Sequence, residues 1–425
     1  MNFNISRRDF LKISALSLIS SLFRKSPVTS AATNNDILCP RQLITDNCAA
    51  SRVIMWHSKE SHPQFQVQLK NADGTEKVFK GAYQRFTDDD TTIYIYRVKL
   101  DSLTPGTSYS YQIQMDSCTS PWYPLTTNDN DTIKALIFPD SQCSDGYITW
   151  KQVATSAFND HPDTPLFINM GDLVDNGEAS YQWRQWFDGI KAFMPMRVFA
   201  PLMGNHETYD LDWKCRLPKA FLNYFSFPDN GSTDFRNYYY SFDYGPVHFI
   251  ALNSQFEEID PIKPGLLQEQ FAWLENDVRT AKKPWNVVLI HKDIINYENL
   301  NSPEPLADID IVGKTFMPYF DKLGIDLVLT AHQHTYRRHG HIYNFSPSED
   351  KGPVYIDTGV AGNCRYNVPR TKRFDKIMLP QPETDNYILL AGNASRLTVQ
   401  CFLPEGKLMD TCTLTNSKQD ISIQK

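Results

Sequence analysis

The feature of this sequence that most restricts its fold is a series of five apolar runs that each end in oxygen or imidazole side chains. The runs and the polar residues after them are Ile133–Phe138 with Asp140 and Gln142, Leu166–Met170 with Asp172 and Asp175, Val198–Met203 with Asn205 and His206, Trp285–Ile290 with His291, and Ile325–Thr330 with His332 and His334. Short apolar runs of this kind are typical of buried strands. Functional side chains gather in the loops at the carboxyl ends of such strands. We therefore expect one site built from five separate loops.

Each of these residues has an ordinary explanation when it is taken alone. A strand-end Asp commonly caps a helix or turns the chain, and a single His is usually an ordinary hydrogen-bonded residue. Four of the ten histidines nevertheless lie in these five loops. Oxygen and imidazole ligands without thiolate suit manganese, iron or zinc. The eight cysteines contain no Cys-x-x-Cys pair, so a zinc knuckle is not indicated. The loops predict a metal site of oxygen and imidazole ligands.

The chain is long enough for two domains. Its 425 residues exceed the usual size of one core, and an apolar content of 41% can fill two. Residues 33–130 contain short alternating segments, among them Phe65–Lys70 and Glu76–Lys80 around an Asn-Ala-Asp-Gly turn, and Thr92–Leu100. This pattern predicts an N-terminal β-sandwich of the fibronectin type III kind, with a structural or interaction role.

Residues 131–425 change to alternating strands and helices. The clearest helix covers residues 265–278, where Leu267, Phe271, Leu274 and Val278 fall on one face. Such a succession is typical of an α/β or α+β domain in which sheets are flanked by helices. The boundary with the first region lies near the polar residues 125–132.

The first 32 residues read as an export signal. The pair Arg7 and Arg8 precedes an apolar segment at residues 13–23, and small residues follow up to a cleavage site near Ala31 or Ala32. These eleven apolar residues are too few to cross about 30 Å of hydrocarbon, so we expect no stable membrane span. We predict export by the twin-arginine (Tat) machinery, which carries proteins that fold first, to a periplasmic or extracellular location.

The formal charge of −7 bears on the kind of partner. It argues against a nucleic-acid scaffold, because no basic surface is available to replace the counterions of the phosphates. An anionic small-molecule substrate would need a local positive charge, which a bound metal could supply.

The five loops resemble those of the calcineurin-like metallophosphoesterase superfamily. The order of motifs in that superfamily is Asp-x-His, Gly-Asp-x-x-Asp, Gly-Asn-His-Glu or Asp, a lone His, and Gly-His-x-His. In the same order this chain has Asp140-Ser141-Gln142, Gly171-Asp172-Leu173-Val174-Asp175, Gly204-Asn205-His206-Glu207, His291, and Ala331-His332-Gln333-His334. The segment "LTPGTSYSYQI" at residues 103–113 resembles the N-terminal domain of purple acid phosphatases. The resemblance implies a four-layer β-sandwich flanked by helices for residues 131–425.

The resemblance also implies a role for each residue. Asp172 would bridge two divalent or trivalent cations (manganese, iron or zinc), which activate a water near neutral pH. The remaining ligands would be Asp140, Gln142 and His334 on one metal, and Asn205, His291 and His332 on the other. His206 would donate to the phosphate or to the leaving-group oxygen, and Asp175 would orient and charge its ring. The ordinary alternative for Asp175 is a helix cap.

Two positions depart from the family pattern. Purple acid phosphatases carry Tyr where this chain has Asp175, and the charge transfer from that Tyr to iron gives their colour. We therefore expect a protein without the purple colour. Gln142 replaces the usual His, and its amide oxygen either binds a metal directly or acts through a water. Arg337 follows the last loop and could bind the substrate phosphate, with a surface role as the alternative.

The sequence predicts an exported dinuclear metal-dependent phosphoesterase. Metal hydroxide would attack phosphorus in a phosphate monoester of a small molecule, while His206 assists departure of the alcohol. A phosphodiesterase or nucleotide pyrophosphatase is the alternative that the Asp-x-Gln loop keeps open. A surface binding module that has lost activity is the alternative from another class, and the intact Asp172, Asn205 and His332 argue against it.

Overall fold

The structure, a computed structural model, describes residues 36–116, 118–380 and 385–416. The predicted export signal at residues 1–32 lies outside this part of the chain. Within the described residues, no helix combines the length and the apolar character that crossing a membrane would require.

The N-terminal strands follow the alternation of the sequence. β3 (Phe65–Asn71) and β4 (Glu76–Phe79) form a hairpin around the predicted turn, and β3 also pairs with β7 (Ser108–Met115). β8 (Cys118–Thr119) and β9 (Tyr123–Thr126) complete this sheet. The facing layer consists of β1 (Leu38–Leu43), β2 (Arg52–Ser58), β5 (Ala82–Asp88) and β6 (Thr91–Leu100). Apolar side chains such as Trp56 and Tyr111 fill the space between the two layers. The predicted β-sandwich is confirmed.

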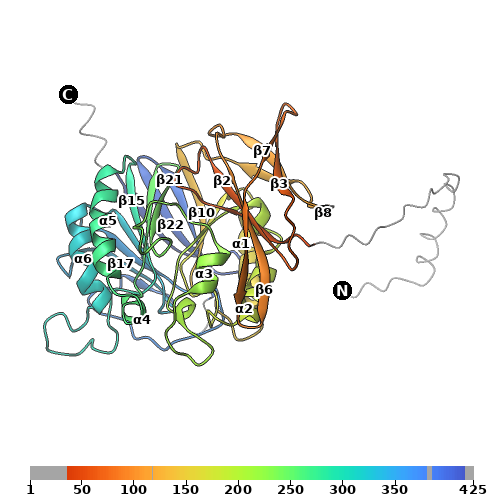
Figure 1. The fold of residues 1–425 in the computed structure, drawn as a ribbon. Coiled ribbons are helices and arrows are strands. Elements are labelled where there is room, and N and C mark those ends of the chain that lie inside the picture. Colours follow the sequence, from red (N-terminus) through yellow and green to blue (C-terminus); the bar gives the residue numbers. More distant parts are fainter. Residues whose placement is uncertain (1–35, 117, 381–384, 417–425) are drawn as a thin grey trace, which may run out of the picture. The chain divides into compact units, whose positions relative to one another are not determined.

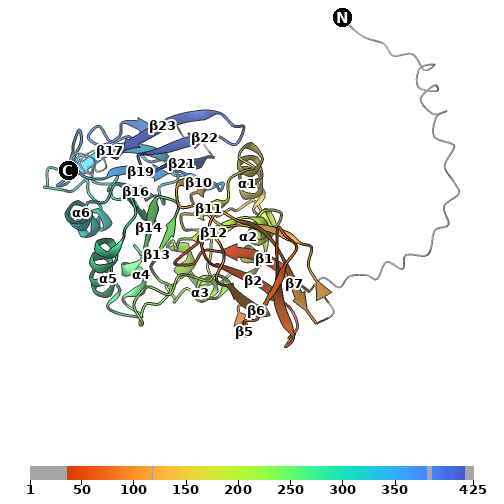
Figure 2. The same ribbon diagram turned by 90° about the horizontal axis from the view of Figure 1, so that it is seen from above.

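One layer of the sandwich continues into the following region. β1 pairs with β2 and, in parallel, with β12 (Val198–Pro201). The resulting ten-stranded sheet has the order β23-β22-β21-β10-β11-β12-β1-β2-β6-β5. Its other strands are β10 (Thr132–Phe138), β11 (Leu166–Asn169), β21 (Tyr387–Asn393), β22 (Arg396–Phe402) and β23 (Leu408–Thr415). Figure 2 shows β12, β1 and β2 side by side, so the backbone ladder runs across the predicted domain boundary at residue 130.

A second sheet faces the first. Its order is β13-β14-β15-β16-β19-β17-β18, and β20 pairs with β17. The strands are β13 (Tyr240–Tyr244), β14 (Val247–Leu252), β15 (Trp285–Ile290), β16 (Leu327–Thr330), β17 (Tyr336–Tyr343), β18 (Ser346–Pro347), β19 (Val354–Thr358) and β20 (Ile377–Met378). β14, β15, β16 and β19 run parallel, and almost every residue of these four strands is fully buried. Burial on both faces explains why these segments are continuously apolar.

Helices cover the outer faces of the two sheets. α1 (Ile148–Asp160) and α2 (Ser180–Ile190) lie beside β10–β12, and α5 (Leu266–Thr280) and α6 (Ile311–Leu323) lie beside the second sheet (Figures 1 and 2). The short helices α3 (Lys219–Tyr224) and α4 (Phe256–Ile259) fill the connections. α5 coincides with the predicted helix and buries Leu274 and Val278. The expected mixed fold, with helices outside two facing sheets, is confirmed.

This topology brings the five predicted loops toward one end of the sheets. β10, β11 and β12 are parallel neighbours in the first sheet, and β15 and β16 are parallel neighbours in the second. The carboxyl ends of parallel neighbours lie at the same edge of a sheet. Loops that are far apart in the sequence therefore meet between the two layers.

Candidate metal centre

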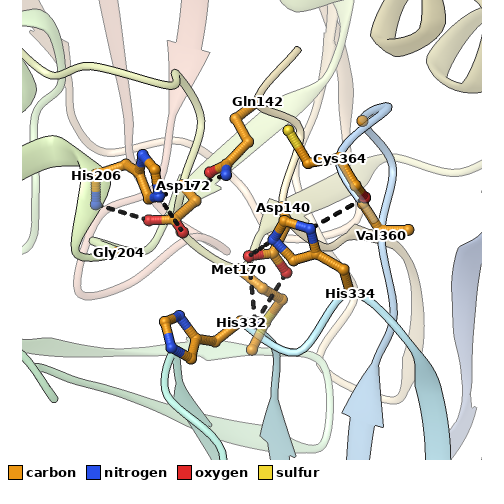
Figure 3. A network of polar contacts seen from close by, with 12 residues as sticks. Asp140, Gln142, Met170, Asp172, Gly204, His206, His332, His334, Val360 and Cys364 are labelled. Atoms are coloured by element: carbon orange, nitrogen blue, oxygen red, sulfur yellow. Dashed lines mark hydrogen bonds and ion pairs between the residues drawn. The ribbon is translucent and has the colours of Figure 1, made fainter. Parts of the chain in front are cut away.

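Acidic and imidazole side chains from the five loops converge at the edge where the parallel strands end. Asp172, His291 and His332 form one group, and Asp140, Asp172 and His334 form another. In each group one ligand atom per residue lies within 4.8 Å of the others. Asp172 belongs to both groups, and Figure 3 shows Asp140 and Asp172 on either side of a common space. The arrangement can hold two cations that share one carboxylate.

The backbone is strained at four of these positions. Asp140, Asp172, His332 and His334 have positive φ angles of 21°, 49°, 73° and 53°. Residues other than Gly rarely adopt this region, and such strain persists where the surrounding structure enforces it, often at functional sites. Each side chain is thereby turned toward the same space at the end of its strand.

Asp172 lies at the centre of the cluster and is 1% exposed. Its Oδ2 lies 3.2 Å from His291 Nε2 and 3.9 Å from His206 Nε2. Its Oδ1 accepts a hydrogen bond from the backbone N–H of His206 at 2.9 Å. Burial opposes ionisation of this carboxyl, but the neighbouring His291 and His206 outweigh burial and hold its pKa below the usual value. Asp172 is therefore a carboxylate that is ready to bind cations.

Backbone carbonyls orient two of the histidines. His291 Nδ1 lies 2.9 Å from the Met170 carbonyl oxygen, and His334 Nδ1 lies 3.1 Å from that of Cys364. A carbonyl can only accept, so each Nδ1 carries the proton and Nε2 faces the cluster, as metal-binding histidines require. His334 Nε2 accordingly lies 3.4 Å from Asp140 Oδ1.

Two neighbouring histidines have opposite pKa shifts. Burial disfavours the charged form of His291, but the nearby Asp172 raises its pKa to about 9. Burial, together with the charge of His291, lowers the pKa of His332 to about 3. Their ring centroids are 5.2 Å apart, so two protonated rings would repel each other. His332 is thus a neutral imidazole, which is the form that binds metal.

The donors present fit a pair of cations. Gln142 is 1% exposed, and its Oε1 has no hydrogen-bond partner among the described residues. An unpaired buried amide oxygen is costly unless a ligand occupies it. Its Nε2 lies 3.4 Å from His206 Nε2, and Figure 3 shows the amide directed at the space beside Asp172. Asn205 Oδ1 lies 3.1 Å from His291 Nε2 and offers a further oxygen.

His206 is held differently from the expectation. Its Nδ1 lies 2.6 Å from the backbone carbonyl oxygen of Asp175, whereas the nearest carboxylate oxygen of Asp175 is 3.8 Å away. The carbonyl therefore orients the ring, and the carboxylate adds only its charge. Burial opposes protonation of His206, but Asp172 and the Asp175 carbonyl raise its pKa above the usual value. Its Nε2 faces Asp172 and Gln142.

Arg337 does not reach the cluster, so its predicted role in binding substrate is corrected. The residue is fully buried, and its guanidinium donates to Asp375 at 2.9 Å and to the carbonyls of Val368 and Pro369. It also lies over the ring of Tyr297. β17 directs this side chain into the protein interior, where it ties a later loop to the sheet.

Sequence reasoning missed the residues that support the loops. Glu207 accepts hydrogen bonds from the backbone N–H groups of Gly204, Asp172 and Leu173 at 2.7, 3.0 and 2.8 Å. A Cβ on Gly204 would lie 2.1 Å from Asp172 Oδ1, so only Gly fits there. Both residues stand in the Gly-Asn-His-Glu motif, which could have indicated them. Tyr366, whose ring stacks on His334 at 4.3 Å, had no signal in the sequence.

Two family comparisons decide the identity of the fold. Residues 133–336 match the family described as calcineurin-like phosphoesterase, and residues 42–127 match the purple acid phosphatase N-terminal domain. The chain therefore contains a calcineurin-like metallophosphoesterase domain. It carries a metal-dependent phosphoesterase domain, and the family implies a dinuclear metal centre.

Two relatives are similar to this chain over more than two thirds of its length. Acid phosphatase type 7 of Mus musculus is 27% identical over 72% of this chain and 73% of its own length. Purple acid phosphatase 15 of Arabidopsis thaliana is 25% identical over 79% of this chain, and the match spans 64% of the Arabidopsis protein. The structure of purple acid phosphatase PPD1 from yellow lupin (Lupinus luteus) has the same fold, with a TM-score of 0.77, 17% identity, and coverage of 92% of this chain and 76% of the lupin chain.

Proposed function

We propose that this chain is an exported dinuclear metallophosphoesterase that hydrolyses phosphate monoesters of small molecules. The observation that carries the proposal is the shared position of Asp172 in two groups of buried ligands. A single cation needs no shared carboxylate, whereas two cations about 3.5 to 4 Å apart do. The acid phosphatases among the relatives support a monoester substrate.

The proposed ligands divide between two positions. Asp140, Gln142 and His334 would hold one cation, Asn205, His291 and His332 the other, and Asp172 both. When bound, the cations would supply Lewis-acid charge for the phosphate oxygens and a water acidified to a nucleophile near neutral pH. Manganese, iron and zinc suit these oxygen and imidazole donors.

His206 would transfer the proton in this reaction. Nδ1 is held by the Asp175 carbonyl, so Nε2 faces the substrate space. As the bond between phosphorus and the ester oxygen breaks, Nε2 would donate its proton to that oxygen, and the alcohol would leave neutral. Asp172 and the Asp175 carboxylate, 3.9 and 3.8 Å from the ring nitrogens, would stabilise the protonated ring. Asp175 leaves no Tyr for charge transfer, so the protein would not be purple.

Export is part of the proposal and has its own support. The Arg7 and Arg8 pair and the apolar residues 13–23 match a twin-arginine signal. Replacing both arginines with Lys should retain the protein in the cytoplasm, and cell fractionation would measure this.

A pair of variants tests the division of roles. Asp172→Asn should lose bound metal and activity together, whereas His206→Ala should keep its metal and lose turnover by about 10²- to 10⁴-fold. Metal content by mass spectrometry and p-nitrophenyl phosphate hydrolysis measure the two effects. Equal metal loss in both variants would refute the division.

Gln142 favours a second candidate, a phosphodiesterase or nucleotide pyrophosphatase. It is a neutral amide where the superfamily motif has His. A clear preference for bis(p-nitrophenyl) phosphate over p-nitrophenyl phosphate would replace the monoesterase proposal with this one. Protein that carries metal but hydrolyses neither ester between pH 4 and 9 would favour a binding module without activity.

A further inference from the structure

Two aromatic side chains stand beside His206 in the loop that follows it. The ring centroids of Tyr209 and Trp213 lie 5.6 and 5.9 Å from the His206 ring centroid, and both rings meet it edge-on. The two rings are 6.0 Å from each other. We call this pair the aromatic wall. Trp213 is 55% exposed although it is a large apolar residue, and together with Tyr209 it offers aromatic surface beside the candidate site.

The loop of the aromatic wall is rigidly built. Tyr209 and Cys215 pair in an antiparallel β-bridge. The backbone N–H of Trp213 donates to the Asp210 carbonyl at 2.9 Å. Asp210 Oδ1 also accepts from the N–H groups of Asp212 and Lys214. Trp213 itself has a φ of 61°, a strained value that this network enforces. An exposed ring on a fixed loop can bind a ligand with little loss of conformational entropy.

The N-terminal domain braces the same loop. Arg216 donates to both carboxylate oxygens of Asp88 at 2.8 and 2.9 Å, and it also contacts Glu178 at 2.8 Å. Glu178 in turn accepts from the Leu211 N–H at 3.0 Å. Asp88 is the last residue of β5 and is 7% exposed. Both bonds to Asp88 come from Nη2 of Arg216, and this largely buried ion pair ties the sandwich to the loop that carries the aromatic wall.

The aromatic wall is next to the residue that would protonate the leaving group. Under the proposed function, His206 protonates the ester oxygen, so the organic part of the substrate begins beside this ring. Tyr209 and Trp213 are the aromatic side chains that this part would meet. We propose that the aromatic wall binds a planar aromatic ring in the leaving group, which makes aryl esters and nucleotides better substrates than alkyl phosphates. This inference rests on the proposed function.

Trp213 is the better position for the test. Tyr209 Oη accepts a hydrogen bond from Asn205 Nδ2 at 3.4 Å, so replacing Tyr209 would also disturb a candidate ligand. Trp213→Ala removes the ring, and Trp213→Phe restores part of it. Trp122→Ala is the matched control, because Trp122 is 40% exposed and lies in the sandwich between β8 and β9.

The assay compares kcat/KM for phenyl phosphate, adenosine 5′-monophosphate and ethyl phosphate. Ratios between the same two esters cancel intrinsic reactivity when variant and parent are compared. Trp213→Ala should lower the phenyl-to-ethyl ratio about threefold to tenfold, with a smaller loss in Trp213→Phe and none in Trp122→Ala. If Trp213→Ala also lowers the ratio of adenosine 5′-monophosphate to ethyl phosphate, the aromatic wall also binds a base that is farther from the ester oxygen. If only the ratio of phenyl to ethyl phosphate falls, the aromatic wall binds only rings attached directly to the ester oxygen, and the nucleotide part of the proposal is refuted.

Binding of non-hydrolysable analogues separates this inference from the proposed function. Calorimetry with benzylphosphonate and propylphosphonate, in which CH₂ replaces the ester oxygen of phenyl and ethyl phosphate, should show a selective loss of affinity for the aromatic analogue in Trp213→Ala. If Trp213→Ala binds both phosphonates as tightly as the parent and has the same ester ratios, the proposed role of the aromatic wall is refuted. A metal-loaded parent that hydrolyses none of the three esters would instead overturn the proposed function.

Discussion

Replacing Glu207 with Gln should weaken the metal centre without removing any proposed ligand. The carboxylate accepts three short backbone hydrogen bonds, two at Oε2 from Gly204 and Asp172 and one at Oε1 from Leu173. Gln keeps one side-chain oxygen. Its least costly orientation places that oxygen where Oε2 of Glu207 stands, so it still accepts from the N–H groups of Gly204 and Asp172. The amide NH₂ then faces the Leu173 N–H, and both are donors.

The cost follows from these contacts. A buried N–H without an acceptor costs about 1 to 3 kcal/mol. Burial and the neighbouring Asp172 raise the pKa of Glu207 to about 7, so above that pH the carboxyl is ionised and the two remaining bonds also lose the strength that a charged acceptor gives. The sum is about 3 kcal/mol of unfolding free energy. The displaced N–H is that of Leu173, which directly follows Asp172 in the chain, and loss of such a supporting contact typically lowers metal affinity about 10- to 100-fold.

The assay measures both quantities. Urea unfolding of metal-free protein gives the stability change, and competition with a chelator gives the metal affinity. Glu275→Gln is the matched control, because Glu275 is a surface residue that pairs with Arg279 and Lys322 and should leave both quantities close to the parent values. Parent-like stability and metal affinity in Glu207→Gln would refute the assigned supporting role.

Two further predictions concern Gly204 and His248. Gly204→Ala places a Cβ 2.1 Å from Asp172 Oδ1, so the carboxylate must move. Bound metal, measured by mass spectrometry, should therefore fall to one equivalent or none. Two retained equivalents would contradict this close approach. His248 is buried, which disfavours its charge, but Asp243 and Asp277, each 2.8 Å away, raise its pKa to about 9. Its folded-state pKa exceeds the unfolded value near 6.5, so up to about 3 kcal/mol of stability is present below pH 6.5 and is lost as the pH rises through 9. The stability gap between parent and His248→Gln in urea unfolding should therefore close between pH 6 and pH 9.5, and a constant gap would contradict the ion pairs.

The sequence determined the elements and the chemical class of the site. Alternation in residues 65–100 specified the sandwich strands, because one face of each strand is buried against a partner layer. The five apolar runs specified buried parallel strands, and the residue types after them specified oxygen and imidazole donors. These features are local, so they can be read from short windows of the chain.

Only the tertiary structure decided which side chains face the cluster and which support it. Arg337 follows the last ligand loop in the sequence, yet the direction of β17 buries it against Asp375. Asp175 acts on His206 mainly through its carbonyl, which no residue type encodes. The pairing of β1 with β12 and the contact of Asp88 with Arg216 join segments that are far apart in the chain. Such contacts depend on the packing of whole sheets, and packing is a property of the folded chain that local patterns do not contain.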